Sequence, residues 1–71
     1  MKYFATFFSD PFDTGIRDVI IKEDREEFLS LVVNYLRERP VGFSMAQYDG
    51  EHFRALPRSS YVEINKRLGR F

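Results

Sequence analysis

The sequence is 71 residues long, and its 11 basic and 11 acidic side chains give a formal net charge of zero. Its residues are 44% apolar and 17% aromatic, with one His and no Cys. This length allows a single domain, over residues 1–71. The apolar content excludes a disordered chain, and the absence of Cys excludes disulfides and thiolate metal sites.

Two further features bear on where such a domain works and how it gains stability. No apolar run reaches the roughly 18 residues of a membrane helix. The first residues also lack the long apolar stretch of a signal peptide, so we expect a cytoplasmic protein that does not enter a membrane. A domain of about 70 residues buries only about 60% of the surface that its unfolded chain exposes, less than a larger domain does. A dense aromatic core or association with a second copy compensates for this.

The first predicted element is a strand over Lys2–Phe8, which is rich in aromatic residues and is followed by turn residues. Both faces of this strand are apolar, since one carries Tyr3, Ala5 and Phe7 and the other carries Phe4, Thr6 and Phe8. Such a strand is covered on both sides, inside a sheet or at a subunit contact. Alternatively, it is a central strand beneath one helix, with some Phe side chains partly exposed.

The segment Ser9–Gly15 predicts a loop, because Pro fixes φ, Asp bonds its own backbone and Gly accepts positive φ. Asp10, Asp13 and Asp18 offer oxygen ligands near a Gly but miss the spacing of a calcium loop. Turn formation and capping explain them instead. We expect a short second strand over Ile16–Lys22.

The clearest element is a helix between Glu23 and Arg39. Asp24 and Glu27 are spaced as a capping-box pair, with acidic residues at the start of the helix and basic residues at its end. Pro40 then ends the helix.

The apolar arc of this helix is unusually wide. At about 100° per residue, its apolar side chains extend from Leu31 to Val33 over about 200°, whereas a helix lying on one sheet needs nearer 100°. The surplus indicates a second partner, and another copy of the chain is the natural candidate. We therefore predict a homodimer with contacts at Leu31, Val33 and Tyr35 of the helix and at Phe4 and Phe8 of the first strand.

After Pro40 the sequence predicts a β-hairpin, with strands over Val41–Tyr48 and Glu51–Leu56. Asp49-Gly50 suits a two-residue turn with positive φ, and this turn pairs Tyr48 with Glu51. Neither face is purely polar. One carries Val41, Phe43, Met45 and Leu56, and the other carries Ala46, Phe53 and Ala55.

The C-terminal segment predicts a short helix over Tyr61–Leu68. Ser60 and Glu63 form a second capping-box pair, and Gly69 lies at a C′ position. The β-branched and aromatic residues of Tyr61–Ile64 can equally form a strand.

No motif predicts catalysis or cofactor binding. His52 is the one side chain that titrates near neutral pH, and no nucleophile-elbow spacing accompanies it. The candidate nucleophiles Ser44, Ser59 and Ser60 are therefore interpreted as ordinary polar residues. We predict a protein that is not an enzyme and holds no metal.

Charge is unevenly distributed along the chain. Residues 1–51 contain 6 basic and 10 acidic side chains, a net of −4, whereas residues 52–71 contain 5 basic and 1 acidic, a net of +4. The basic segment either lies against the acidic start of the main helix or, as the alternative function, binds nucleic acid weakly. Its candidate contact residues are Arg54, Arg58, Lys66, Arg67 and Arg70.

An aromatic first strand, an amphipathic helix over residues 23–39 and a hairpin over residues 41–56 resemble the small prophage-associated Yopt-like family in size and element order. That family is described as homodimeric, with one helix and three strands per subunit and no assigned activity. The resemblance implies a dimer and transfers no functional residues.

We therefore expect an α+β domain in which an antiparallel sheet of about three strands packs on one main helix, with a short C-terminal helix possible. The predicted function is that of a non-catalytic protein-interaction module, homodimeric and of phage or prophage type, that binds a host or phage protein.

Overall fold

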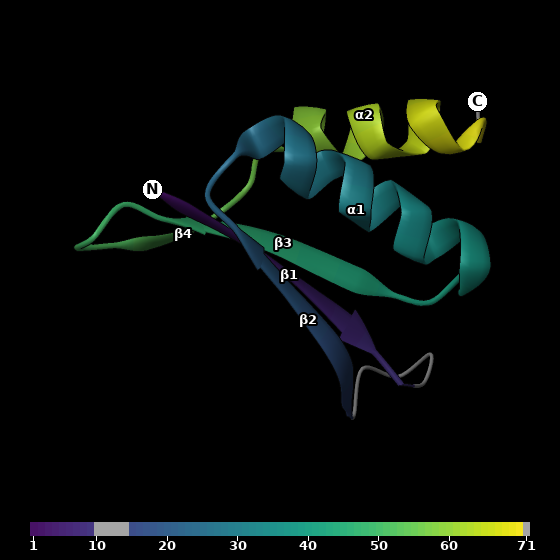
Figure 1. The fold of residues 1–71 in the computed structure, drawn as a ribbon, viewed down its shortest axis with the longest axis horizontal. Helices are drawn as coiled ribbons and strands as arrows, with labels where there is room; N and C mark the ends of the chain where they lie inside the picture. Colours follow the sequence, from purple (N-terminus) through teal and green to yellow (C-terminus); the bar gives the residue numbers. More distant parts are fainter. Residues whose placement is uncertain (10–14, 71) are drawn as a thin grey trace.

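A computed structural model describes residues 1–9 and 15–70 of the chain. The elements follow the order ββαββα, and the strands form one antiparallel sheet in the order β2-β1-β3-β4. Both helices cover the same face of this sheet (Figure 1). The elements are β1 (Lys2–Phe8), β2 (Ile16–Lys22), α1 (Arg25–Glu38), β3 (Phe43–Tyr48), β4 (Phe53–Ala55) and α2 (Arg58–Leu68).

The predicted α+β fold class is confirmed, with four strands in the sheet where about three were expected and with the C-terminal helix present. The sheet has four strands, because Ile16–Lys22 pairs along β1 as a full strand. β1 is an interior strand, with β2 on one side and β3 on the other. The loop aspartates Asp10 and Asp13 lie outside the described residues.

The limits of α1 follow from its capping residues. The Asp24 carboxylate accepts a hydrogen bond from the backbone N–H of Glu27 at 2.8 Å, as the capping-box pattern predicts. At the other end, the backbone N–H of Arg39 donates to the Tyr35 carbonyl, and Pro40 follows. The helix therefore begins and ends close to the predicted limits.

The hairpin between β3 and β4 has a different register from the predicted one. Tyr48 pairs with Phe53 rather than with Glu51, so the connection is longer than two residues. The Asp49 carboxylate causes this, because it accepts hydrogen bonds from the backbone N–H groups of Glu51 and His52 at 2.8 and 2.9 Å. These bonds also lower the pKa of Asp49. Because the shift is two residues, each side chain keeps its predicted face.

The C-terminal segment is helical, but its predicted start is wrong. α2 begins at Arg58, directly after Pro57, and Ser60 lies buried within its first turn instead of capping it. Proline is well suited to the residue before or at the first helical position, since its missing N–H has no partner to lose there. Gly69 ends the helix with a φ of 76°, as predicted.

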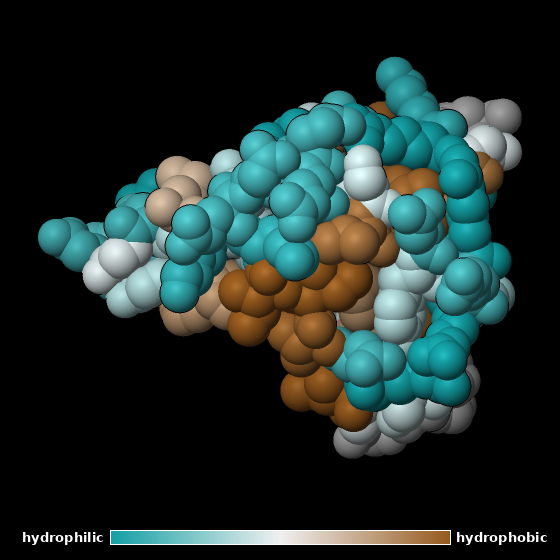
Figure 2. Space-filling model, viewed as in Figure 1, coloured by the Kyte–Doolittle hydropathy of each residue, from teal (hydrophilic) through white to brown (hydrophobic). Residues whose placement is uncertain are grey.

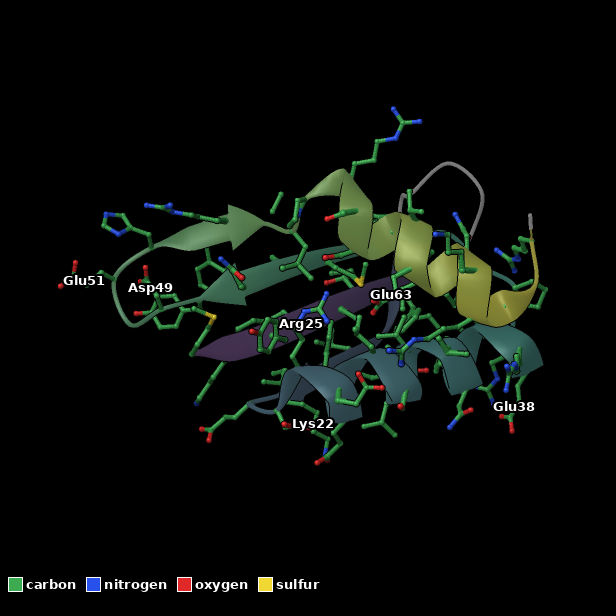
Figure 3. The ribbon with its side chains drawn as sticks, turned by 90° about the horizontal axis from the view of Figure 1, so that it is seen from above. Lys22, Arg25, Glu38, Asp49, Glu51 and Glu63 are labelled. Atoms are coloured by element: carbon green, nitrogen blue, oxygen red, sulfur yellow. The ribbon has the colours of Figure 1, made fainter. Side chains whose placement is uncertain are left out.

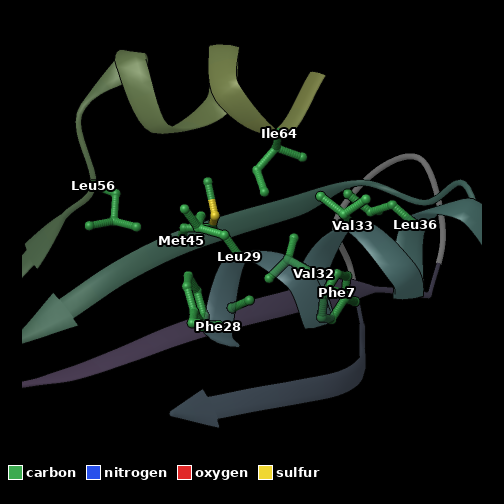
Figure 4. Packing of buried hydrophobic residues seen from close by; sticks show 10 residues of the cluster. Phe7, Phe28, Leu29, Val32, Val33, Leu36, Met45, Leu56 and Ile64 are labelled. Carbon is green, nitrogen blue, oxygen red and sulfur yellow. The ribbon is translucent and has the colours of Figure 1, made fainter. Parts of the chain in front are cut away.

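The hydrophobic core lies between the sheet and the two helices (Figure 4). It also accounts for the wide apolar arc of α1. One part of the arc packs on β1 and β2, and another part packs against α2, so the helix has a second partner within the same chain. The core residues are Ala5, Phe7, Phe28, Leu29, Val32, Val33, Leu36, Met45, Leu56 and Ile64.

Candidate functional site

The sheet face opposite the helices is the main candidate for a functional surface. Side chains alternate between the two faces of a strand, so the residues beside the core-facing Ala5, Phe7 and Met45 point away from the helices. Paired residues of neighbouring strands share a face. We call this surface the open face; it comprises Lys2, Phe4, Thr6, Phe8, Ile16, Val19, Ile21, Ser44, Ala46, Tyr48, Phe53 and Ala55.

Large apolar side chains are concentrated on the open face. Among the described residues, the large hydrophobic side chains that remain exposed are Met1 and four of the open face: Ile16 at 67%, Val19 at 48%, Ile21 at 51% and Phe53 at 64%. In Figure 2, apolar atoms form one continuous area that follows β2 below α1. Scattered exposed apolar residues need no explanation, but a contiguous patch marks a binding surface.

Three aromatic rings form a cluster at one end of the open face. The ring of Phe53 lies 4.7 Å from that of Tyr48 and 5.1 Å from that of Phe4, measured between centroids. Phe4 is on β1 and Phe53 on β4, so these rings meet above β3, which runs between the two strands. The three rings are thus in contact with one another, while Phe53 remains exposed to a partner.

The open face carries almost no charge. Lys2 lies at the start of β1, and the exposed Arg17 lies at the register shift near the start of β2, so both charges are at ends of the face. Thr6 lies opposite Ser44 near its centre. The other two charged residues of β2 contact α1 instead. Asp18 accepts a hydrogen bond from the Tyr35 hydroxyl at 2.7 Å, and Lys22 lies 3.2 Å from Glu27. A face with an apolar centre and cations only at its ends fits an apolar partner better than a row of phosphate groups.

β2 adds a second feature to this surface, because it is an edge strand. One side of β2 pairs with β1, and the other side has no neighbouring strand in the sheet. The pairing shifts register between Phe7 and Phe8, where Phe8 pairs with Ile16. Such an irregularity twists an edge and discourages further strand pairing. The side chains of β2 are therefore better placed for contact than its backbone.

The sequence-predicted dimer residues fall into two groups. Phe4 and Phe8 lie on the open face and are partly exposed. Val33 is 5% exposed and belongs to the core, so it has no surface left for a second copy. Leu31 and Tyr35 lie on α1, and the Tyr35 ring stacks on Phe7 with 3.9 Å between centroids. Val33 is thus a core residue, whereas Leu31 and Tyr35 are half-buried, and a dimer contact through the helix stays a prediction.

Sequence reasoning missed the contribution of β2. Ile16, Val19 and Ile21 were assigned to a short strand with no role at a surface. The alternation of Val19 and Ile21 with Asp18 and Lys22 was the available signal, whereas Ile16 joins this face only through the register shift opposite Phe8. Phe53 was correctly placed on the face of the hairpin that Ala46 and Ala55 share.

The basic C-terminal segment lies partly against the acidic start of α1, as one of the two sequence alternatives predicted. Arg67 lies 2.8 Å from the Glu26 carboxylate and 3.3 Å from that of Glu63, which also faces Arg25 at 3.7 Å. Arg25 and Glu63 point toward one another between the two helices in Figure 3. The hydrogen bond from Arg67 lowers the pKa of Glu26.

The remaining basic candidates are exposed but dispersed over several elements. Arg54 is on β4, Arg58 begins α2, Lys66 is near the end of α2, and Arg70 follows it. The aromatic residue Phe71, which a stacking role would use, lies outside the described residues. One of the five candidates, Arg67, is thus already engaged within the chain.

The candidate catalytic residues do not share a site. Ser44 is on the open face, whereas Ser60 is buried on the helix side of the sheet. His52 lies in the exposed hairpin loop, where its backbone N–H donates to Asp49. Within residues 1–9 and 15–70, no three His, Cys, Asp or Glu side chains gather in a way that would hold a metal ion.

Comparison with protein-family models, curated proteins and solved structures found no match to this chain. In the part of the chain that the structure describes, neither helix is long and apolar enough to span a membrane. The open face is therefore the feature of the molecule that bears on its function.

Proposed function

We propose that this protein is a non-catalytic protein-interaction module that docks its partners through the open face. The observation that carries the proposal is the alignment of the exposed Ile16, Val19, Ile21 and Phe53 on one sheet face. Exposing these side chains to water opposes solubility, and covering them with a partner removes that cost. The module works in the cytoplasm and associates with itself and with a host or phage protein.

The resemblance to the Yopt-like family contributes one expectation to this proposal, namely that the protein is a homodimer. The described residues form four strands and two helices, whereas that family is described as having three strands and one helix. The homodimer and the role as a phage-type accessory protein are kept as parts of the proposal. The uncovered sheet face supports the homodimer, whereas the phage-type role is what the resemblance implies.

The test uses a matched pair of charge substitutions. Val19→Glu places a carboxylate at the centre of the β2 side of the open face, and Lys66→Glu changes an exposed residue of α2. Proteins retained from a native-host extract are identified by mass spectrometry and then purified for direct titration. We expect Val19→Glu to weaken the purified complex at least about 10-fold, because it buries an unpaired charge, and Lys66→Glu to leave it unchanged.

The competing function is nucleic-acid binding by Arg54, Arg58, Lys66 and Arg70. A basic interface gives oligonucleotide affinity that collapses between low and physiological salt. Oligonucleotide binding at low salt that Lys66→Glu weakens and Val19→Glu spares would contradict the proposal. Absence of binding at low salt would exclude the alternative.

A further inference from the structure

We propose that the open face is occupied by the open face of a second copy, so that two sheets pack face to face with the helices outside. This inference rests on the proposed function and names its first partner. It also fixes the arrangement of the dimer, which the sequence leaves open. The resulting dimer has four layers, in the order helices, sheet, sheet, helices.

The charge of the open face is the first argument for a second copy. A two-fold interface brings each residue near copies of its own neighbours, so a face with charges of one sign repels itself. The two cations on or beside the open face, Lys2 and Arg17, lie near the starts of the antiparallel strands β1 and β2, away from its apolar centre. The chain as a whole has a net charge of zero, so long-range repulsion does not oppose association.

The composition of the open face is the second argument. Two antiparallel sheets that pack face to face interdigitate apolar side chains in a layer about 10 Å thick. Ile, Val, Phe, Ala and Thr side chains on the open face match such a layer, and the small polar residues Thr6 and Ser44 are paired directly across β1 and β3. A sandwich needs no charged partner surface.

The distribution of large and small side chains is the third argument. One row across the sheet contains Ile21, Phe4, Ala46 and Ala55, on β2, β1, β3 and β4. Its large residues lie on one half of the sheet and its small residues on the other. A two-fold axis parallel to the strands, between β1 and β3, stacks β2 of each copy on β4 of the other. Ile21 then faces the exposed Ala55 of the second copy, so a large side chain meets a small one.

The available area sets the strength of this dimer. Strands of up to seven residues are about 23 Å long and lie about 4.8 Å apart, so the open face has a footprint of roughly 400 Å² before side-chain relief is counted. This is a large area for a chain with 4832 Å² of accessible surface. Two such faces bury about 800 Å², which is in the range of weak, transient complexes below about 1,200 Å², and we expect a dissociation constant of roughly 1–100 μM.

The first experiment measures mass by sedimentation equilibrium over that concentration range. The native chain should approach twice its 8.5 kDa monomer mass as concentration rises. Ile21→Glu should raise the dissociation constant at least about 100-fold, because the carboxylate is desolvated without a partner. Ser30→Glu adds the same charge at an exposed position of α1 and should leave the mass unchanged. Circular dichroism checks that both variants are folded.

A mixing experiment tests the stacking of β2 on β4. Ile21→Glu and Ala55→Lys should each be monomeric alone, and an equimolar mixture should dimerise, because each mixed pair brings one Glu opposite one Lys and keeps one native contact. If Ile21→Glu makes the chain monomeric and the equimolar mixture with Ala55→Lys also stays monomeric, β2 does not stack on β4 in the dimer. An elongated dimer in small-angle scattering would indicate pairing of β2 edges and would overturn this stacking too.

The failure of this inference differs from the failure of the proposed function. A native chain that stays at 8.5 kDa throughout, yet binds an identified protein in a manner sensitive to Val19→Glu, overturns the self-association and leaves the proposed function standing. A chain that is monomeric and binds no protein through the open face overturns both.

Discussion

The two faces of the sheet have similar composition and opposite environments. On one face, Ala5, Phe7 and Met45 are buried beneath the helices, whereas on the other, Val19, Ile21 and Phe53 remain exposed. The difference arises from topology, because α1 and α2 both follow their strands onto the same side of the sheet (Figure 1). Stability therefore resides on the covered face, and the uncovered apolar face is available for recognition.

The largest effect expected from this comparison comes from truncating one Phe on each face. Phe7→Ala removes a fully buried ring and should lower the free energy of unfolding by about 3–5 kcal/mol. Phe53→Ala removes a ring that is mostly exposed and should change it by less than about 1 kcal/mol. Urea denaturation at a concentration below the onset of association measures both. Equal losses would show that the open face is part of the core.

A smaller effect is expected at the start of the helix that covers the sheet. Asp24→Ala removes the acceptor for the Glu27 backbone N–H and should lower the free energy of unfolding by about 1 kcal/mol. Asp24→Asn retains a capping oxygen and should lose much less. Glu23→Ala, at the exposed neighbouring position, is the control for lost negative charge. A larger loss for Glu23→Ala than for Asp24→Ala would contradict the capping account.

The smallest effect is electrostatic and concerns the contact between the helices. Arg67 lowers the pKa of Glu26 below its ordinary value of 4.5, so this contact stabilises the fold above about pH 4.5 and is lost as pH falls through the folded-state pKa. Arg67→Met should reduce the loss of stability on acidification, and Lys66→Met should not. Both are measured by urea denaturation between pH 6 and pH 3. An unchanged pH dependence in Arg67→Met would contradict this role.

Local signals predicted most of the elements. The strand at Lys2–Phe8, the cap at Asp24 and the helix end at Gly69 all follow from short-range chemistry, and each is confirmed. The start of α2 was misplaced, because Ser60 and Glu63 have the spacing of a capping box while Pro57, three residues earlier, begins the helix. The burial of Ser60 is decided by tertiary packing, which spacing does not reveal.

The candidate site was predicted less well, because it depends on which elements pack together. The apolar arc of α1 is wide, as the sequence indicated, and either a second copy of the chain or a second helix could cover its surplus surface. Val33 shows that the second helix takes this surface, since it lies in the core that α2 completes. The uncovered apolar surface is on the sheet instead, where Phe4 and Phe8 were already implicated.

The hairpin shows how one side chain changes a register without changing a surface. Asp49 bonds two backbone N–H groups and lengthens the turn, which moves the pairing of Tyr48 from Glu51 to Phe53. The displacement is an even number of residues, so Phe53 remains on the open face. The composition of the surface was therefore predictable even though the pairing was not.

The most direct test of the central claim is a series of two-dimensional amide NMR spectra of the native chain at increasing concentration. If the open face associates, the amide signals of Thr6, Val19 and Ser44 shift progressively while those of the exposed positions of α2 remain fixed. If the shifts instead concentrate at Leu31 and its neighbours on α1, or if no signal moves up to millimolar concentration, the open face does not bind a second copy.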